Sequence, residues 1–156
     1  FSFNRFDLNV MLNWVQGFEI FNQAGSFLLN EQAWSTPTRR LIGNYFTEDN
    51  KDAMYARPLN KPTDKLYENS SIMVEDASYL RISDINFGYT FDSKMLEKIR
   101  LHSLRLYVSA HNPFIFTKYS GYNPEVSNSK NPLTPGIDYG TYPTSKSFVL
   151  GVNIKF

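Results

Sequence analysis

The chain has 156 residues, a formal net charge of +1 and no cysteine. Because the charges nearly balance, we expect no nucleic-acid partner. The lack of cysteine excludes disulfides, thiol catalysis and cysteine-ligated zinc. Hydrophobic residues make up 42% of the chain, yet the mean hydropathy is −0.38, so apolar and polar residues must be interleaved. No apolar run approaches the ~18 residues of a transmembrane helix, so contact with a bilayer would have to be made by strands.

The first segment with a period of two runs from Arg5 to Gly17. A helix would place Asn9 and Asn13 on the same face as the apolar residues, so the pattern predicts a strand. One phase is apolar and the other mostly polar: Phe6, Leu8, Val10, Leu12 and Trp14 alternate with Asp7, Asn9, Met11 and Asn13.

The second segment runs from about Ser78 to Phe91, and its apolar phase changes partway along. Leu80 and Ile82 hold one phase, and the later apolar residues hold the other. The change falls at Ser83-Asp84, where a β-bulge would restore the alignment. The apolar residues after the change are Ile85, Phe87, Tyr89 and Phe91.

The third and fourth segments alternate in the same way. The third runs from Leu104 to Asn112, and we expect Pro113 to end it or to mark a break, because proline cannot donate to a central ladder. The fourth runs from Ser147 to Phe156, and ~10 tilted residues are enough to span a hydrocarbon core. Its apolar phase consists of Phe148, Leu150, Val152, Ile154 and Phe156.

The connections between the four segments are long, short and long, with roughly 60, 12 and 30 residues. In an antiparallel order both long connections leave the same side, as do the long extracellular loops of outer-membrane barrels. The short connection is expected to be a solvated turn that forms a helical turn with Ser93 as its N-cap. We therefore predict an all-β fold with four antiparallel strands of a transmembrane barrel and two long extracellular loops.

Four strands cannot form a complete barrel. Unpaired backbone groups at two sheet edges are costly in lipid, and the smallest single-chain barrels have about eight strands. Either the chain is part of a larger barrel or several copies share one. We expect the first, because Phe1 begins the chain in what resembles the middle of a strand, with no secretion signal before it.

Three stretches resemble a known family in their order and spacing: Val74 to Phe91, Leu104 to Glu125, and Gly136 to Pro143 with the strand that follows. They resemble the C-terminal end of SusC/RagA-type TonB-linked outer-membrane proteins of Bacteroidetes. The resemblance covers about the last 90 residues well, and Trp34 and the first strand look similar too. His111 stands where the family often has Gln, and Pro113 stands where it often has Leu.

The resemblance implies that residues 1–156 are the C-terminal portion of a barrel with about 22 strands. The parent would carry an N-terminal plug and sit in the bacterial outer membrane. Through that missing N-terminal part it would use the TonB complex to import a nutrient, usually an oligosaccharide or peptide. A SusD-like surface lipoprotein would be its extracellular partner. The resemblance also implies that the barrel-assembly machinery reads the alternating last strand and its terminal Phe156.

Two groups of residues are candidates for contact with other molecules. The polar phases would face the barrel lumen, where we expect their side chains to hydrogen-bond to the plug. Alternatively, they would line the path of the transported solute. They include Asp7, Asn9, Asn13, Arg105 and His111. Tyrosines in the last long loop suit sugar rings or peptide side chains, although packing within the loop or against the lipoprotein is the favoured interpretation. These are Tyr119, Tyr122, Tyr139 and Tyr142.

No constellation of residues indicates an enzyme, a metal site or a cofactor. Glu75 and Asp76 are adjacent, so on a strand they would point to opposite faces and could not form a catalytic pair. His102 and His111 are too few for a metal site. Two other functions remain open: a secreted carbohydrate-binding β-sandwich, and a four-strand contributor to an oligomeric pore.

Overall fold

A computed structural model describes residues 1–30, 38–58, 67, 69–126 and 136–156; Trp34 lies outside these ranges. The chain folds into two compact units, each described here by itself. Unit 1 consists of residues 1–17, 78–118 and 143–156, and unit 2 consists of residues 18–77 and 119–142. Each of the two long connections therefore contributes to unit 2.

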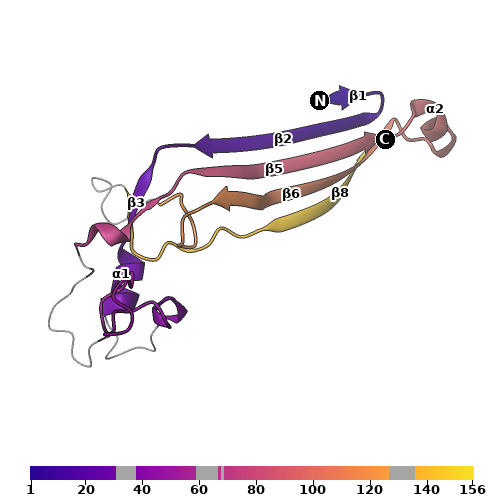
Figure 1. Ribbon diagram of the computed structural model, residues 1–156. Coiled ribbons are helices and arrows are strands. Elements are labelled where there is room, and N and C mark those ends of the chain that lie inside the picture. The colour runs from indigo at the N-terminus through magenta and orange to yellow at the C-terminus, as the bar shows by residue number, and fades with distance from the viewer. Residues whose placement is uncertain (31–37, 59–66, 68, 127–135) are drawn as a thin grey trace. The chain divides into compact units, whose positions relative to one another are not determined.

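Unit 1 is a five-stranded antiparallel sheet in the order β1-β2-β5-β6-β8 (Figure 1). The four predicted antiparallel strands are confirmed, and a short β1 is added in front of them through a tight turn at Asn4, whose φ is +55°. The strands are β1 (Ser2–Phe3), β2 (Phe6–Val15), β5 (Tyr79–Thr90), β6 (Ser103–Thr117) and β8 (Ser147–Lys155).

A register irregularity crosses three neighbouring strands: β2 has no extra residue there, β5 has one and β6 has two. Ser83 of β5 is an extra residue relative to β2, where Met11 and Leu12 are consecutive. On β6, Asn112 and the proline after it lie between the partners of Ile82 and Asp84. The bulge predicted at Ser83 is confirmed. Of the two outcomes expected at Pro113, an end of the strand is wrong and a break is confirmed. The register shifts there, and β6 continues for four residues beyond the proline because the bulge absorbs it.

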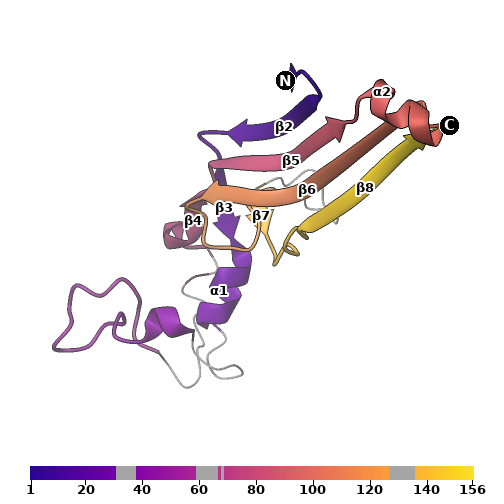
Figure 2. The same cartoon turned by 90° about the vertical axis from the view of Figure 1, so that its right-hand side faces the viewer.

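The register places all four apolar phases on one face of the sheet. Rows of apolar side chains cross the strands, for example Leu8, Phe87, Val108 and Leu150. Much of this face is exposed: Leu150 is 79% exposed, Phe148 73% and Trp14 69%. The opposite face carries the polar phases. Figure 2 shows the sheet turned by 90°.

The short connection between β5 and β6 contains α2 (Ser93–Leu96) and η3 (Glu97–Ile99). Its helical character is confirmed, but the prediction of Ser93 as N-cap is wrong. Asp92 is the cap: its backbone is extended and its carboxylate accepts a hydrogen bond from the Lys94 N–H at 3.1 Å. A carboxylate suits this position because it also faces the positive end of the helical turn.

Unit 2 contains a three-stranded sheet in the order β4-β3-β7. Residues that the sequence analysis treated as loop thus have secondary structure and a small core of their own. One apolar cluster contains Leu29, Leu41, Tyr55, Tyr67 and Met73, and the other contains Ile20, Ala77 and Tyr119. The elements are β3 (Glu19–Asn22), α1 (Gln23–Asn30), η1 (Arg39–Leu41), η2 (Ser71–Met73), β4 (Val74–Asp76) and β7 (Ile137–Asp138). Within the described ranges, no helix has the length and apolar character needed to cross a membrane.

Candidate functional site: a polar sheet face and a tyrosine-bearing loop

An arginine on the polar face of unit 1 reaches across a whole strand. Arg105 of β6 donates from Nε to Asp7 Oδ1 at 3.0 Å and from Nη2 to Oδ2 at 2.5 Å, although Asp7 is on β2, two strands away. The guanidinium crosses Gly88 of β5: a Cβ at this glycine would stand 2.4 Å from Nη2 of Arg105. Arg105 Nη2 also donates to Asn86 at 3.2 Å. The bidentate geometry therefore depends on a glycine in the intervening strand.

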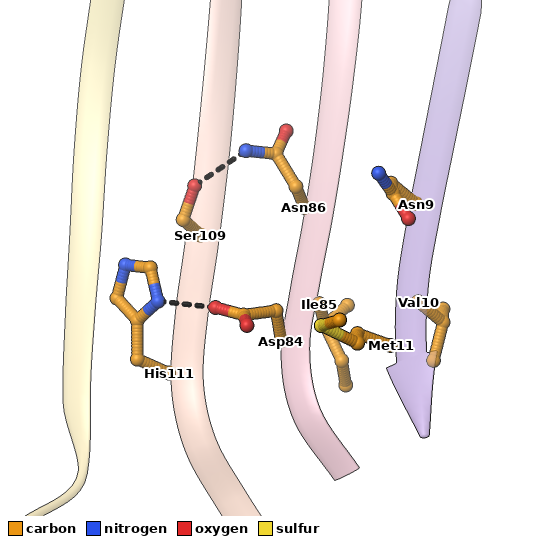
Figure 3. Close-up of a pocket in the computed structure, with 8 residues that line it drawn as sticks. All are labelled: Asn9, Val10, Met11, Asp84, Ile85, Asn86, Ser109 and His111. Atoms are coloured by element: carbon orange, nitrogen blue, oxygen red, sulfur yellow. Dashed lines mark hydrogen bonds and ion pairs between the residues drawn. The ribbon is translucent and has the colours of Figure 1, made fainter. Parts of the chain in front are cut away.

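A shallow depression of about 370 Å³ lies farther along the same face, between β2, β5 and β6 (Figure 3). Two cross-strand pairs border it. Asn86 donates to Ser109 Oγ at 2.8 Å, and His111 Nδ1 hydrogen-bonds to Asp84. Asn9 and Met11 also line the depression, from the neighbouring strand. Its lining therefore combines amide, hydroxyl, carboxylate and imidazole groups with three apolar residues, Val10, Met11 and Ile85, a mixture suited to weak polar contacts.

The five residues predicted to face a lumen lie together on this polar face. Asp7 and Arg105 form the ion pair, while Asn9 and His111 line the depression. Asn13 donates to Ser83 Oγ at 2.9 Å. Among the residues that the structure describes, no group of three or more His, Asp or Glu side chains is placed to hold a metal ion. What this arrangement offers is hydrogen bonding and one ion pair.

The four candidate tyrosines of unit 2 divide into one buried residue and three exposed ones. Tyr119 is 5% exposed, and its hydroxyl donates to Asp138 Oδ2 at 2.7 Å. The other three are exposed by 78% (Tyr122), 59% (Tyr139) and 89% (Tyr142). Tyr119 thus has the packing role that the sequence analysis kept as an alternative, and the other three remain candidates for ligand contact.

The hydrogen bond between Tyr119 and Asp138 is reflected in the pKa of both groups. Burial, followed by the hydrogen bond to Asp138 and its negative charge, raises the pKa of Tyr119 well above its ordinary value. Burial by itself would raise the pKa of Asp138, but hydrogen bonds from Tyr119 and from the Thr141 and Gly140 N–H groups outweigh it and lower that pKa. At neutral pH the pair is therefore a neutral phenol that donates to a carboxylate.

A second polar cluster of unit 2 contains residues that the sequence analysis did not select. Ser120 donates from its N–H to Glu75 Oε2 at 2.8 Å and from its hydroxyl to Oε1 at 2.6 Å. Asn22 donates to the same carboxylate at 2.9 Å. Glu75 thus ties β4 to β3 and to the loop after β6, which is a structural task. The spacing Asp-X-Gly at residues 138–140 is a turn signal that points to Asp138, but no local pattern links Glu75 to Ser120.

The apolar phase of β8 is exposed along its length. Exposed fractions are 73% for Phe148, 79% for Leu150, 52% for Val152, 47% for Ile154 and 86% for Phe156. The strand itself ends at Lys155, one residue before the predicted end. Within the described residues, neither apolar cluster includes any of these five side chains.

Comparison with known proteins gives consistent results, although no family model matches the chain. It is 32% identical to TonB-dependent receptor P3 of Formosa agariphila, over 99% of this chain and 15% of the relative. It is 36% identical to TonB-dependent receptor SusC of Bacteroides thetaiotaomicron, over 56% of this chain and 8% of the relative. A solved structure of the RagAB peptide transporter superposes with a TM-score of 0.76 at 22% identity, over 99% of this chain and 16% of that chain.

These comparisons identify the class of protein. The sheet, its two unlike faces and the relatives place the chain among the TonB-dependent receptors. Within that class it is similar to SusC in sequence and to the RagAB peptide transporter in fold. It spans about 15% of the length of the first of these relatives. The relatives named here are receptors, and the solved structure is of a transporter.

Proposed function

We propose that the chain is the C-terminal portion of an outer-membrane importer and forms four strands in the wall of its large β-barrel. The observation that carries the proposal is the pair of unlike sheet faces. A continuous apolar face with side chains up to 79% exposed lies opposite a face of ion pairs and amides. Lipid is the solvent that makes such an apolar face favourable, and the polar face then lines the lumen.

The height of the apolar face supports the assignment to a bilayer. Phe6 and Trp14 span eight residues of β2, which is about 20 Å along the membrane normal at ~3.3 Å per residue and a tilt of ~40°. On β6, Leu104 and Phe116 span about 30 Å by the same arithmetic. These values bracket the apolar band of ~25 Å in outer-membrane barrels.

The two alternative functions are less favoured. In a β-sandwich a second sheet would cover the apolar face, yet residues such as Leu150 and Phe148 are largely exposed. In an oligomeric pore several copies would have to close the barrel. The length of the relatives supports closure by other strands of the same polypeptide, because this chain spans only 15% of one of them.

The partners of the importer are proposed by extension from its relatives. We propose TonB as the energy source through the plug-bearing part of the parent, and a SusD-like surface lipoprotein at the extracellular mouth. The barrel-assembly machinery would recognise β8 and Phe156. The solute would be an oligosaccharide or oligopeptide, with Tyr122, Tyr139 and Tyr142 in contact with it and the polar sheet face in contact with the plug.

Site-directed spin labelling of the full-length parent in lipid vesicles tests the membrane assignment. The 156 residues contain no cysteine, so an introduced cysteine would be the single labelling site within them. We expect a nitroxide at Leu150 to be relaxed mainly by oxygen, which partitions into lipid, and a nitroxide at Val149 mainly by a water-soluble nickel chelate. Equal nickel accessibility at both positions would contradict the proposal.

Uptake by cells tests the transport assignment. We expect deletion of the parent gene to abolish uptake of at least one fluorescently labelled oligosaccharide or peptide, and complementation to restore it only in cells with functional TonB. Uptake that persists without the parent or without TonB would contradict the importer function while leaving the barrel assignment intact.

A further inference from the structure

One row of facing residues on the polar sheet face contains two glycines with a tyrosine between them. The register places Gly88 of β5 opposite Tyr107 of β6, and Tyr107 opposite Gly151 of β8. A glycine weakens a strand interior and often marks a point where another group approaches the backbone closely. Arg105 makes such an approach at Gly88, on its way to Asp7. Gly151 is the second point of this kind in the row.

The side chain that lies over Gly151 is that of Tyr107. A Cβ at this glycine would stand 2.2 Å from Cζ of the phenol, 2.4 Å from its hydroxyl oxygen and 2.5 Å from Cε1. The tip of the ring therefore covers the backbone of β8, and an alanine there would displace it. The Cζ atom of Arg105 lies 5.3 Å from the ring centroid, a cation–π contact that helps to hold the ring in this orientation.

The two crossings have the same geometry, and one of them shows what such a crossing does. Nη2 of Arg105 would stand 2.4 Å from a Cβ at Gly88, and it binds the carboxylate of Asp7 on the strand beyond. The Tyr107 hydroxyl oxygen would stand equally far from a Cβ at Gly151, 2.4 Å. It is therefore placed to bind a side chain of a strand beyond β8. Within the described residues, β8 is the edge of the sheet (Figure 2).

A strand must pair with this edge in the parent, because unpaired backbone groups are costly in lipid. Neighbouring strands lie about 4.8 Å apart, so a short side chain on that strand can meet the hydroxyl. The positive guanidinium over the ring favours a hydroxyl that donates its proton. The partner should therefore be an acceptor, a carboxylate or amide oxygen.

We infer that Tyr107 binds the strand that pairs with the outer edge of β8, by donating a hydrogen bond across Gly151 to a carboxylate or amide oxygen on the lumen face. The inference rests on the proposed function, in which β8 is the final strand of the barrel and its outer neighbour is the first strand after the plug. Together with the pair of Arg105 and Asp7, this contact would connect β2 through β8 to the strand that closes the barrel.

Photo-cross-linking in the full-length parent tests the inference. Replacement of Tyr107 by p-azidophenylalanine keeps the ring and puts the reactive group where the hydroxyl stands. Heat-modifiable mobility first shows that the barrel is assembled in lipid vesicles, and the cross-linked peptides are then identified by mass spectrometry after irradiation and proteolysis. The control is the same replacement at Tyr89, which lies on the apolar face of β5 between β2 and β6.

We expect the peptide cross-linked to position 107 to come from the first barrel strand of the parent and to carry an acidic or amide residue. The control at position 89 should give no such peptide. Gly151→Ala should lower the yield of the cross-link about fivefold or more, because the added methyl group displaces the ring. Gly88→Ala is the matched variant, since it adds a methyl group at the other crossing, and it should leave the yield within about twofold.

A double-mutant cycle then tests the hydrogen bond itself. Tyr107→Phe should lower the temperature at which the full-length parent loses its compact electrophoretic mobility. Alanine in place of the cross-linked acidic or amide residue should lower it by a similar amount, and the double variant should lower it no further. Additive shifts would overturn the hydrogen bond.

Other results would overturn the inference as a whole. These are a cross-link from position 107 to the plug, to residues 1–156 alone, or to no peptide, and an equal loss of yield in Gly88→Ala, which would mean that any added methyl group disturbs the sheet. The spin-label test at Leu150 and Val149 and the uptake test do not involve Tyr107. A failure of this inference is therefore distinguishable from a failure of the importer function.

Discussion

A charge placed on one or the other side of β8 gives a quantitative test of the two sheet faces. Leu150 and Val149 are neighbours that point to opposite faces, with exposed fractions of 79% and 41%. Leu150 pairs with Val108 in an apolar row, and Val149 pairs with Ser109 on the polar face. Leu150→Arg therefore places a guanidinium in lipid if our assignment is right, and Val149→Arg places it in the lumen.

The expected cost depends on depth in the bilayer. Leu150 lies six residues before Phe156, which is about 15 Å along the membrane normal at ~3.3 Å per residue and a tilt of ~40°. In an apolar band of ~25 Å this position is near the middle, where an arginine on the lipid face costs about 2–4 kcal/mol. The same change at Val149 should cost less than about 1 kcal/mol, because lumen positions tolerate charge.

The free energy of unfolding of the full-length parent in lipid vesicles, from guanidinium titration followed by tryptophan fluorescence, measures both costs. Heat-modifiable mobility of the same samples shows whether each variant has assembled. If both arginines destabilise equally, or if Val149→Arg costs more than Leu150→Arg, the assignment of the apolar face to lipid is refuted.

Three further predictions concern other parts of the chain. Replacement of Phe156 by aspartate should lower the amount of heat-modifiable parent in the outer membrane, and an unchanged amount would contradict its role in assembly. Gly88→Ala should displace the Arg105 guanidinium, so in a double-mutant cycle with Arg105→Ala the effects on thermal stability should be non-additive; simple additivity would contradict the crossing geometry. Because folding lowers the pKa of Asp138 below its ordinary value of 3.8, the stabilisation by this carboxylate should be complete above that pH and lost as the pH falls through the lowered value. Cleavage of the loop around Asp138 by an acid-stable protease should therefore increase at low pH in the wild type but show no such change in Asp138→Ala.

Local sequence patterns were sufficient for the four long strands of unit 1 and the bulge in β5. The period-two alternation of β2 and β8 places apolar residues on one face and polar residues on the other, so each strand carries the signal by itself. At Ser83 a single extra residue inverts the alternation, which made the bulge visible. At Asn112 and Pro113 two extra residues restore it, so the sequence showed a proline but not the continuous strand through it.

The contacts that organise the candidate sites required the tertiary structure. Arg105 and Asp7 are 98 residues apart and meet only because β5 lies between their strands with a glycine at the crossing point. Tyr119 and Asp138 meet across 19 residues, and no local pattern distinguishes the buried Tyr119 from its exposed neighbours. Alternation reports which medium a side chain meets. It carries no information about which distant residue is its partner, because strand order and register bring the two together.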